Sequence, residues 1–87
     1  ELRRQIDGID EQLLELLAKR MRISREIGVY KKEHNMPILQ SPRYSEILEK
    51  RSNMGEQMDL STDFVKEILK EIHEESVRQQ MIIMNEQ

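Results

Sequence analysis

Two cations occupy positions where the spacing of apolar residues predicts a hydrophobic side chain. Arg20 lies on an apolar line between Leu16 and Ile23, and Lys31 follows eleven residues after Arg20. Eleven helical steps of about 100° come within roughly 20° of three full turns, so both cations lie on one helix face. The planar fork of an arginine in apolar surroundings matches two oxygens of a carboxylate or phosphate. This face therefore suits a small anion.

Two hydrogen-bonding side chains interrupt a second apolar line in the same way. Ser76 and Gln80 continue the line of Ile72 and are four residues apart, so they are neighbours on a helix. Each polar residue also has a purely structural explanation: an arginine can extend to the surface, and a seam glutamine can fix helix register. The charge distribution favours ligand binding, because residues 19–32 hold six cations and one acid, whereas residues 56–76 hold seven acids and two lysines.

The sequence lacks the residues that several kinds of chemistry need. Its 87 residues include no Cys, which excludes disulfides and thiolate zinc sites, and it has no glycine-rich phosphate loop and no Ser-His-Asp arrangement. We therefore expect no metal and no cofactor, and a site that binds an anion or catalyses by positioning and electrostatics alone. A net charge of −3 and three aromatic residues argue against nucleic-acid binding. Without a membrane-length apolar run or a leader, we expect a cytoplasmic protein.

A long helix must carry the two cations. Apolar residues recur at steps of mostly four and three, which predicts one helix of roughly 33 residues that ends near Asn35-Met36-Pro37. Such a helix is about 50 Å long, whereas a compact chain of this length has a diameter of roughly 31 Å. The apolar stripe therefore needs cover from outside one protomer, and a symmetric dimer with paired long helices provides it. The stripe consists of Leu2, Ile6, Ile9, Leu13, Leu16, Ile23, Ile27 and Tyr30.

A second, short helix follows the turn. Ser41 is expected as its N-cap and Pro42 as its first residue, because proline suits the first helical position. Tyr44, Ile47 and Leu48 would form its apolar face. Gly55 is expected to end it, and residues 56–60 to form a loop.

A third helix of medium length follows that loop. Asp59 or Ser61 is expected to cap it, and Asp63 lies in its first turn, where the helix dipole favours an acid. No segment alternates with the period of a strand. The sequence thus predicts one all-α domain over residues 1–87, with a long, a short and a medium helix.

The order and spacing of these residues resemble the all-helical class of chorismate mutase over nearly the whole chain. That family converts chorismate, a dicarboxylate, to prephenate by a Claisen-type pericyclic rearrangement in phenylalanine and tyrosine biosynthesis. The resemblance implies an intertwined homodimer of three-helix protomers with two equivalent sites, and no cofactor. The resemblance is carried by Leu2-Arg3-x-x-Ile6, Ile9-Asp10, Leu13-Leu14-x-Leu16-Leu17-Ala18-x-Arg20, Ile27-Gly28-x-x-Lys31, Pro37-Ile38, Arg43 and Glu75-Ser76-Val77-x-x-Gln80.

The resemblance assigns a role to each catalytic residue. Arg20 is expected to hold one substrate carboxylate, and Arg3 to reach in from the other protomer and hold the second. Lys31 and Gln80 are expected to hydrogen-bond the ether oxygen of the breaking C–O bond, where negative charge develops. Donors aimed at developing charge lower the barrier directly.

The remaining pocket residues include two departures from the family pattern. Arg43 and Ser76 are expected to position the substrate, and Ile27 to form an apolar wall. Many relatives carry a glutamate, which accepts a hydrogen bond from the substrate hydroxyl, where this chain has Tyr44, and often an aspartate near Gln40. The resemblance leaves open whether Tyr44, Gln40, the backbone or no group at all makes that contact, and Tyr44 is as consistent with a helix core.

Members of the family are often fused to prephenate dehydratase, prephenate dehydrogenase or DAHP synthase, and a start at Glu1 suits a domain excised from such a protein. The rival hypothesis is a helical dimerisation, docking or regulatory module in such a fusion. In such a module the polar seam residues would set the register of the paired helices. This hypothesis predicts no pocket for a small ligand.

Overall fold

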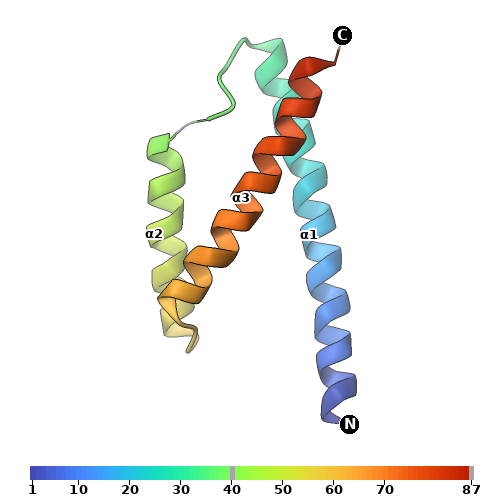
Figure 1. Cartoon of the computed structure of the whole chain (residues 1–87), viewed down its shortest axis with the longest axis vertical. Helices are drawn as coiled ribbons and strands as arrows, with labels where there is room; N and C mark the ends of the chain where they lie inside the picture. Colours follow the sequence, from blue (N-terminus) through green and yellow to red (C-terminus); the bar gives the residue numbers. More distant parts are fainter. Residues whose placement is uncertain (40, 87) are drawn as a thin grey trace.

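Three helices make up the described part of the computed structural model, which covers residues 1–39 and 41–86, without the side chain of Ser41. They are α1 (Leu2–Glu33), α2 (Ser41–Gln57) and α3 (Thr62–Asn85), as Figure 1 shows. No strand occurs in these residues, so the predicted all-α class and the order of a long, a short and a medium helix are confirmed.

Helix α3 joins the other two helices. It packs against the C-terminal half of α1 and against α2, whereas the backbones of α1 and α2 lie apart from each other within the described residues (Figure 1). The N-terminal half of α1 projects beyond this packed region. The molecule therefore extends 49 Å along its longest axis and only 14 Å along its shortest. The expectation that the first helix exceeds a compact globule is confirmed.

Helices α1 and α2 end with the same backbone motif. Asn35 and Asp59 adopt left-handed conformations, with φ of 53° and 63°. The amide of Met36 donates to the carbonyl of Lys31 at 2.8 Å, and that of Leu60 donates to the carbonyl of Gly55 at 2.9 Å. These six-to-one bonds are those of a Schellman motif, in which a glycine or asparagine usually takes the left-handed position.

The prediction that Gly55 ends the second helix is wrong. Gly55 lies inside α2, and Asp59 is the residue that takes the left-handed position after it. A Cβ atom on Gly55 would lie 2.7 Å from Cγ2 of Val65, so the glycine lets α3 approach α2 closely. A glycine near a helix end serves packing here rather than termination, and the sequence pattern alone does not separate these two roles.

Ser61, and not Asp59, caps the third helix. Its side chain accepts a hydrogen bond from the amide of Phe64 at 3.3 Å, and Asp63 lies in the first turn as expected. The structure begins α2 at Ser41, and because the Ser41 side chain lies outside what is described, its capping role stays a prediction.

No hydrophobic side chain of the described residues is buried. The apolar stripe of α1 is open to solvent, with Leu2 75% and Leu16 64% exposed. Soluble monomers rarely leave so continuous an apolar surface uncovered. None of the three helices combines the length and apolarity that crossing a membrane requires, within the residues that the structure describes.

Candidate active site

Side chains from all three helices surround one cavity of about 400 Å³. Helix α1 supplies one wall with its C-terminal half, α2 the opposite wall, and α3 the side between them. The lining residues are Arg20, Ile23, Ser24, Ile27 and Lys31 of α1, Ile38 of the following loop, Arg43, Tyr44, Ile47, Leu48 and Arg51 of α2, and Leu69, His73, Ser76, Val77 and Gln80 of α3.

The cavity carries an excess of positive charge. Four lining side chains are cationic, and none of the described lining residues is an acid. Desolvation, and next the charge of Arg51, lower the pKa of Arg20, while desolvation and then Arg43 lower the pKa of Lys31. Cations that repel one another without a compensating carboxylate favour an anionic ligand. The cations are Arg20, Lys31, Arg43 and Arg51.

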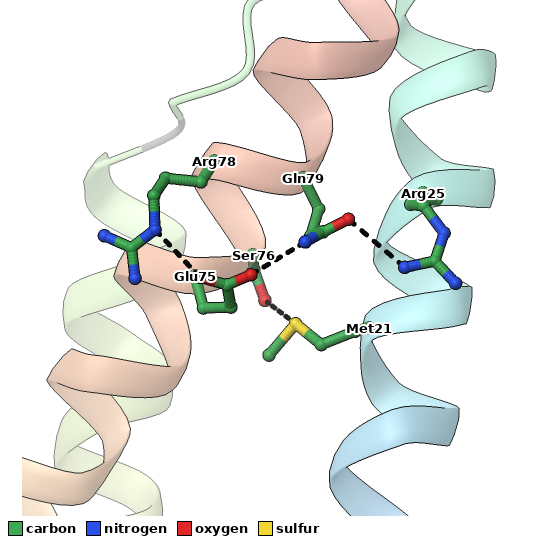
Figure 2. Close-up of polar contacts among 6 residues, drawn as sticks. All are labelled: Met21, Arg25, Glu75, Ser76, Arg78 and Gln79. Carbon is green, nitrogen blue, oxygen red and sulfur yellow. Dashed lines mark hydrogen bonds and ion pairs between the residues drawn. The ribbon is translucent and has the colours of Figure 1, made fainter.

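Ser76 fixes the guanidinium of Arg20. Nη1 of Arg20 donates to Oγ of Ser76 at 3.0 Å, and the hydroxyl of Ser24 donates to the same oxygen at 3.0 Å. Oγ of Ser76 in turn donates to the sulfur of Met21 at 3.8 Å (Figure 2). The serine thus uses its donor and both acceptor positions. Ser76 is buried, so its hydroxyl holds one guanidinium nitrogen in a fixed orientation. The other donors of Arg20 remain for a ligand.

Lys31 and Gln80 form a pair across the α1–α3 interface. Nζ of Lys31 donates to Oε1 of Gln80 at 3.1 Å and to the carbonyl of Ile38 at 2.7 Å. The Gln80 amide oxygen is therefore occupied, and its NH₂ group remains available as a donor. One ammonium hydrogen of Lys31 also remains. The pair presents two donors from opposite helices to one region of the cavity.

A glycine allows α1 and α3 to approach each other closely beside this pair. A Cβ on Gly28 would lie 3.2 Å from Cα and 3.3 Å from Cγ of Gln80. Both distances are tight, and one of them is to backbone. The buried Gly28 therefore sets the separation of the helices at the level of Lys31 and Gln80.

Gly28→Leu is expected to lower the free energy of unfolding by about 1–3 kcal/mol, because the new side chain must push α3 away from α1. The matched control is Gly8→Leu. A Cβ at Gly8 meets nothing within 4 Å, and Gly8 lies outside the apolar stripe, so this variant should gain up to about 1 kcal/mol of helix propensity. Denaturant unfolding measures both variants, and equal stability of the two would contradict this role of Gly28.

A chain of polar contacts on another face holds α1 and α3 in register. Arg25 donates to Oε1 of Gln79 at 3.2 Å, and Gln79 donates to Glu75 at 2.7 Å (Figure 2). Arg78 completes an ion pair with Glu75 at 2.8 Å. The hydrogen bonds from Gln79 and Arg78 lower the pKa of the Glu75 carboxyl. These exposed or partly buried contacts each contribute little stability, and they bind the Glu75 carboxylate outside the cavity lining.

Most of the predicted site residues come together around the cavity. Arg20, Lys31, Arg43, Ser76 and Gln80 all line it, with Ile27 and Tyr44. Arg3 does not, because it is exposed in the first turn of α1, at the end marked N in Figure 1, which projects away from the other helices. Gln40 lies outside the described residues, so its predicted contact to substrate stays a prediction.

The sequence analysis missed two functional candidates in the cavity wall. Arg51 follows Tyr44 by seven residues, and so continues the apolar face of α2 as Arg20 continues that of α1. His73 lies three residues before Ser76 and seven before Gln80, and so shares their line. The spacing that identified Arg20 and Gln80 would have identified both residues if the lines had been extended.

The described residues contain no set of side chains suited to bind a metal ion. No group of three or more His, Cys, Asp or Glu side chains there is close enough to hold a metal ion.

Comparison with known proteins identifies the family. Residues 2–81 match the family model described as chorismate mutase type II. The T-protein of Enterobacter agglomerans is 35% identical over 75 residues, which cover 86% of this chain and 20% of that protein. The bifunctional chorismate mutase/prephenate dehydratase of Buchnera aphidicola is 35% identical over 83 residues, or 95% of this chain and 22% of the relative. The Escherichia coli K12 protein of the same name is 29% identical over 85 residues.

The chain thus spans about a fifth of the length of the curated relatives that it matches. The match covers the whole cavity, because residues 2–81 include every side chain that lines it. The chain belongs to the chorismate mutase type II family.

Proposed function

We propose that the chain catalyses the reaction for which its family is named, the rearrangement of chorismate to prephenate in phenylalanine and tyrosine biosynthesis. The observation that carries the proposal is the cavity of about 400 Å³, which four cations line without a described carboxylate. A cavity of this size suits a small molecule. A dicarboxylate would neutralise two of the four charges and relieve the repulsion between them.

The arginines would bind the substrate carboxylates. Arg20 is already oriented by Ser76 at 3.0 Å, so it needs little reorganisation to accept a carboxylate. Arg51 lies near enough for its charge to lower the pKa of Arg20, which supports a shared grip on one carboxylate. Arg43, whose charge lowers the pKa of Lys31, would hold the substrate close to the reacting bond.

Lys31 and Gln80 would supply the catalytic step. A pericyclic rearrangement needs no nucleophile, but negative charge develops on the ether oxygen as the C–O bond breaks. The ammonium of Lys31 and the amide NH₂ of Gln80 are held together by their own 3.1 Å hydrogen bond, and both can donate to that oxygen. Because the donors are oriented before the substrate binds, they stabilise the transition state without further rearrangement.

A second copy of the chain would complete each site. The exposed stripe of α1 gives an area that a symmetric partner helix can cover, and it supports the intertwined homodimer that the sequence analysis predicts. Arg3 is exposed at the far end of the same helix. In such a dimer, Arg3 would enter the partner's cavity and hold the second carboxylate.

The chain would work as one domain, residues 1–87, of a longer protein. Its relatives are about five times longer, and those from Buchnera and Escherichia coli are named bifunctional chorismate mutase/prephenate dehydratase. We propose a fusion to an enzyme of aromatic biosynthesis, with prephenate dehydratase the best supported. The expected cytoplasmic location is part of this proposal. Immunoblotting of fractionated cells with an antibody to this chain tests both the length and the location.

The direct test is the disappearance of chorismate and the formation of prephenate in the presence of the isolated chain. Sedimentation gives its oligomeric state in the same buffer. A folded dimer that does not accelerate the reaction would contradict the proposal. A thermal melt with a dicarboxylate transition-state mimic distinguishes the docking module, because a ligand that binds only the folded state raises the melting temperature. No shift at saturation would favour the module.

The activity is expected to fall at alkaline pH. Lys31 donates only while it is protonated, and desolvation and Arg43 hold its pKa below the ordinary 10.5. The value of kcat/KM, which reports the free enzyme, should therefore decline with a midpoint below 10.5. Bound dianion raises the pKa of Lys31, so kcat should decline at higher pH than kcat/KM.

Rate profiles from neutral pH to about pH 11 measure both declines. Lys31→Arg is the control, because its guanidinium stays charged throughout this range. This variant should be less active at neutral pH, since its geometry differs, but its profile should be flat. An unchanged alkaline decline in Lys31→Arg would show that another group is responsible.

A further inference from the structure

The cavity is rich in hydrogen-bond donors and poor in acceptors. Its four cations only donate. The Oε1 atom of Gln80 accepts from Lys31, and Oγ of Ser76 accepts from both Arg20 and Ser24. A ligand that offers carboxylates is served well by such a lining. A ligand hydroxyl that must donate a hydrogen bond has few partners left.

Two of the remaining side-chain acceptors lie together on the cavity wall. The rings of Tyr44 and His73 are stacked, with centroids 3.9 Å apart and planes inclined by 20°. Both residues line the cavity, one from α2 and the other from α3. Within the described residues, neither the Tyr44 hydroxyl nor a His73 ring nitrogen forms a hydrogen bond that would occupy it. The stack fixes the orientation of both rings.

We propose that His73, held by its stack on Tyr44, is a substrate-positioning residue whose imidazole nitrogen accepts a hydrogen bond from the ring hydroxyl of the substrate. The inference rests on the proposed function and gives that site a specificity residue. A neutral imidazole has one acceptor nitrogen, whereas the hydroxyl of Tyr44 is a weaker acceptor and prefers to donate. A ligand without the hydroxyl would lose this contact and keep every contact to the cations.

The surroundings keep His73 in the form that accepts. Desolvation lowers its pKa below 6.5, and the charge of Arg20 on α1 lowers it further. Glu74 on α3 opposes these effects, and Lys31 on α1 adds a smaller lowering. Arg43 and Arg51 of α2 line the same cavity and disfavour a further positive charge. His73 is therefore neutral at neutral pH. Protonation at acid pH removes the acceptor, because both nitrogens of the imidazolium donate.

The test compares two dicarboxylate transition-state mimics, one with the ring hydroxyl and one with hydrogen in its place. Calorimetry on the dimeric chain is expected to show that the wild type prefers the hydroxylated mimic by about threefold to tenfold, the usual range for one neutral hydrogen bond. His73→Phe keeps a stacking ring but has no nitrogen, and should bind both mimics equally. Tyr44→Phe keeps the stack and His73, and should retain the preference.

Two results would overturn the inference. Either His73→Phe retains the preference, which points to Gln40 or the backbone, or Tyr44→Phe abolishes it, which assigns the contact to the tyrosine.

These measurements keep the two proposals separate. A wild-type chain that binds neither mimic and leaves chorismate unchanged contradicts the proposed function itself. A wild-type chain that binds both mimics and converts chorismate, but whose hydroxyl preference does not depend on His73, contradicts this inference alone.

Discussion

Lys31→Ala is expected to lower kcat by about 10²–10³-fold, since the loss of one donor to developing charge typically costs about 2.7–4 kcal/mol of transition-state stabilisation. The substitution removes the ammonium that contacts Gln80 at 3.1 Å, so the amide also loses its orientation. The effect should fall on kcat more than on KM, because the ether oxygen carries its negative charge only in the transition state. Steady-state kinetics at neutral pH, with thermal melts to verify folding, measure it.

Lys32→Ala is the matched control. Lys32 is the neighbouring lysine on α1, and its Nζ donates to the backbone carbonyls of Ile83 and Glu86 near the end of α3, outside the cavity. Its removal should change the free energy of unfolding by at most about 1 kcal/mol and leave kcat within about twofold. A Lys31→Ala variant that folds and turns over like Lys32→Ala would contradict the catalytic role of Lys31.

Gln80→Glu refines the same test. A carboxyl at this position would ionise beside Lys31 and lose its donor, whereas an amide donates at any pH. The variant should therefore recover activity only as the pH falls far enough to protonate the carboxyl. An activity that does not depend on pH in this variant would indicate that Gln80 acts by packing alone.

The helical periodicity sufficed to predict which polar residues lie on the apolar faces of the helices. Arg20 and Lys31 lie eleven residues apart on one helix, and their common face depends only on helix geometry. The same holds for Ser76 and Gln80. That the two lines face each other follows from Gly28, whose missing side chain allows α3 to approach α1. Resemblance supplied the identity of the ligand, which the periodicity did not.

Features that depend on contacts between helices were harder to predict. Gly55 resembled a helix end, but its position is required by Val65 on another helix. In the pattern of α3 alone, His73 resembles an ordinary packing residue. Its stack depends on α2, which places the ring centroid of Tyr44 3.9 Å from that of His73. Arg51 resembled one charge among many on an exposed helix. The packing role of Gly55 and the stack of His73 on Tyr44 were missed for the same physical reason, since a single helix pattern does not contain the position of its partner helix. Arg51, and the place of His73 on the cavity face, follow from extending the apolar lines along the sequence.

The absence of buried hydrophobic side chains among the described residues connects folding with catalysis. A chain whose buried side chains are Ser24, Ser52, Ser76 and Gln80 has little hydrophobic burial of its own to stabilise it. If a second copy covers the stripe of α1, the same contact that stabilises the protomer also delivers Arg3 to a cavity. The stability and the activity of the chain should then both rise with protein concentration, over the same range.

Complementation between two weakened variants is expected to demonstrate that two chains share each site. Arg3→Ala and Arg20→Ala should each lose about 10–100-fold in kcat/KM, because each removes a charged hydrogen bond to a carboxylate. In a mixed dimer, the cavity of the Arg3→Ala chain keeps Arg20 and receives Arg3 from its partner. The cavity of the other chain lacks both arginines. Random mixing makes half of the dimers mixed, each with one intact site, so the activity should recover to roughly a quarter of the wild-type value.

The two variants are refolded together in equal amounts, and chorismate turnover is compared with the average of the separate variants. Arg20→Ala mixed with Lys31→Ala is the matched control, because both residues belong to the cavity of their own chain and no mixed dimer contains an intact site. This control should show no recovery. If the Arg3 mixture also stays at the average of its components, while sedimentation shows that mixed dimers have formed, Arg3 does not act in the partner's cavity. The second carboxylate must then be held by Arg43 or Arg51 of the same chain, and dimerisation would contribute stability alone.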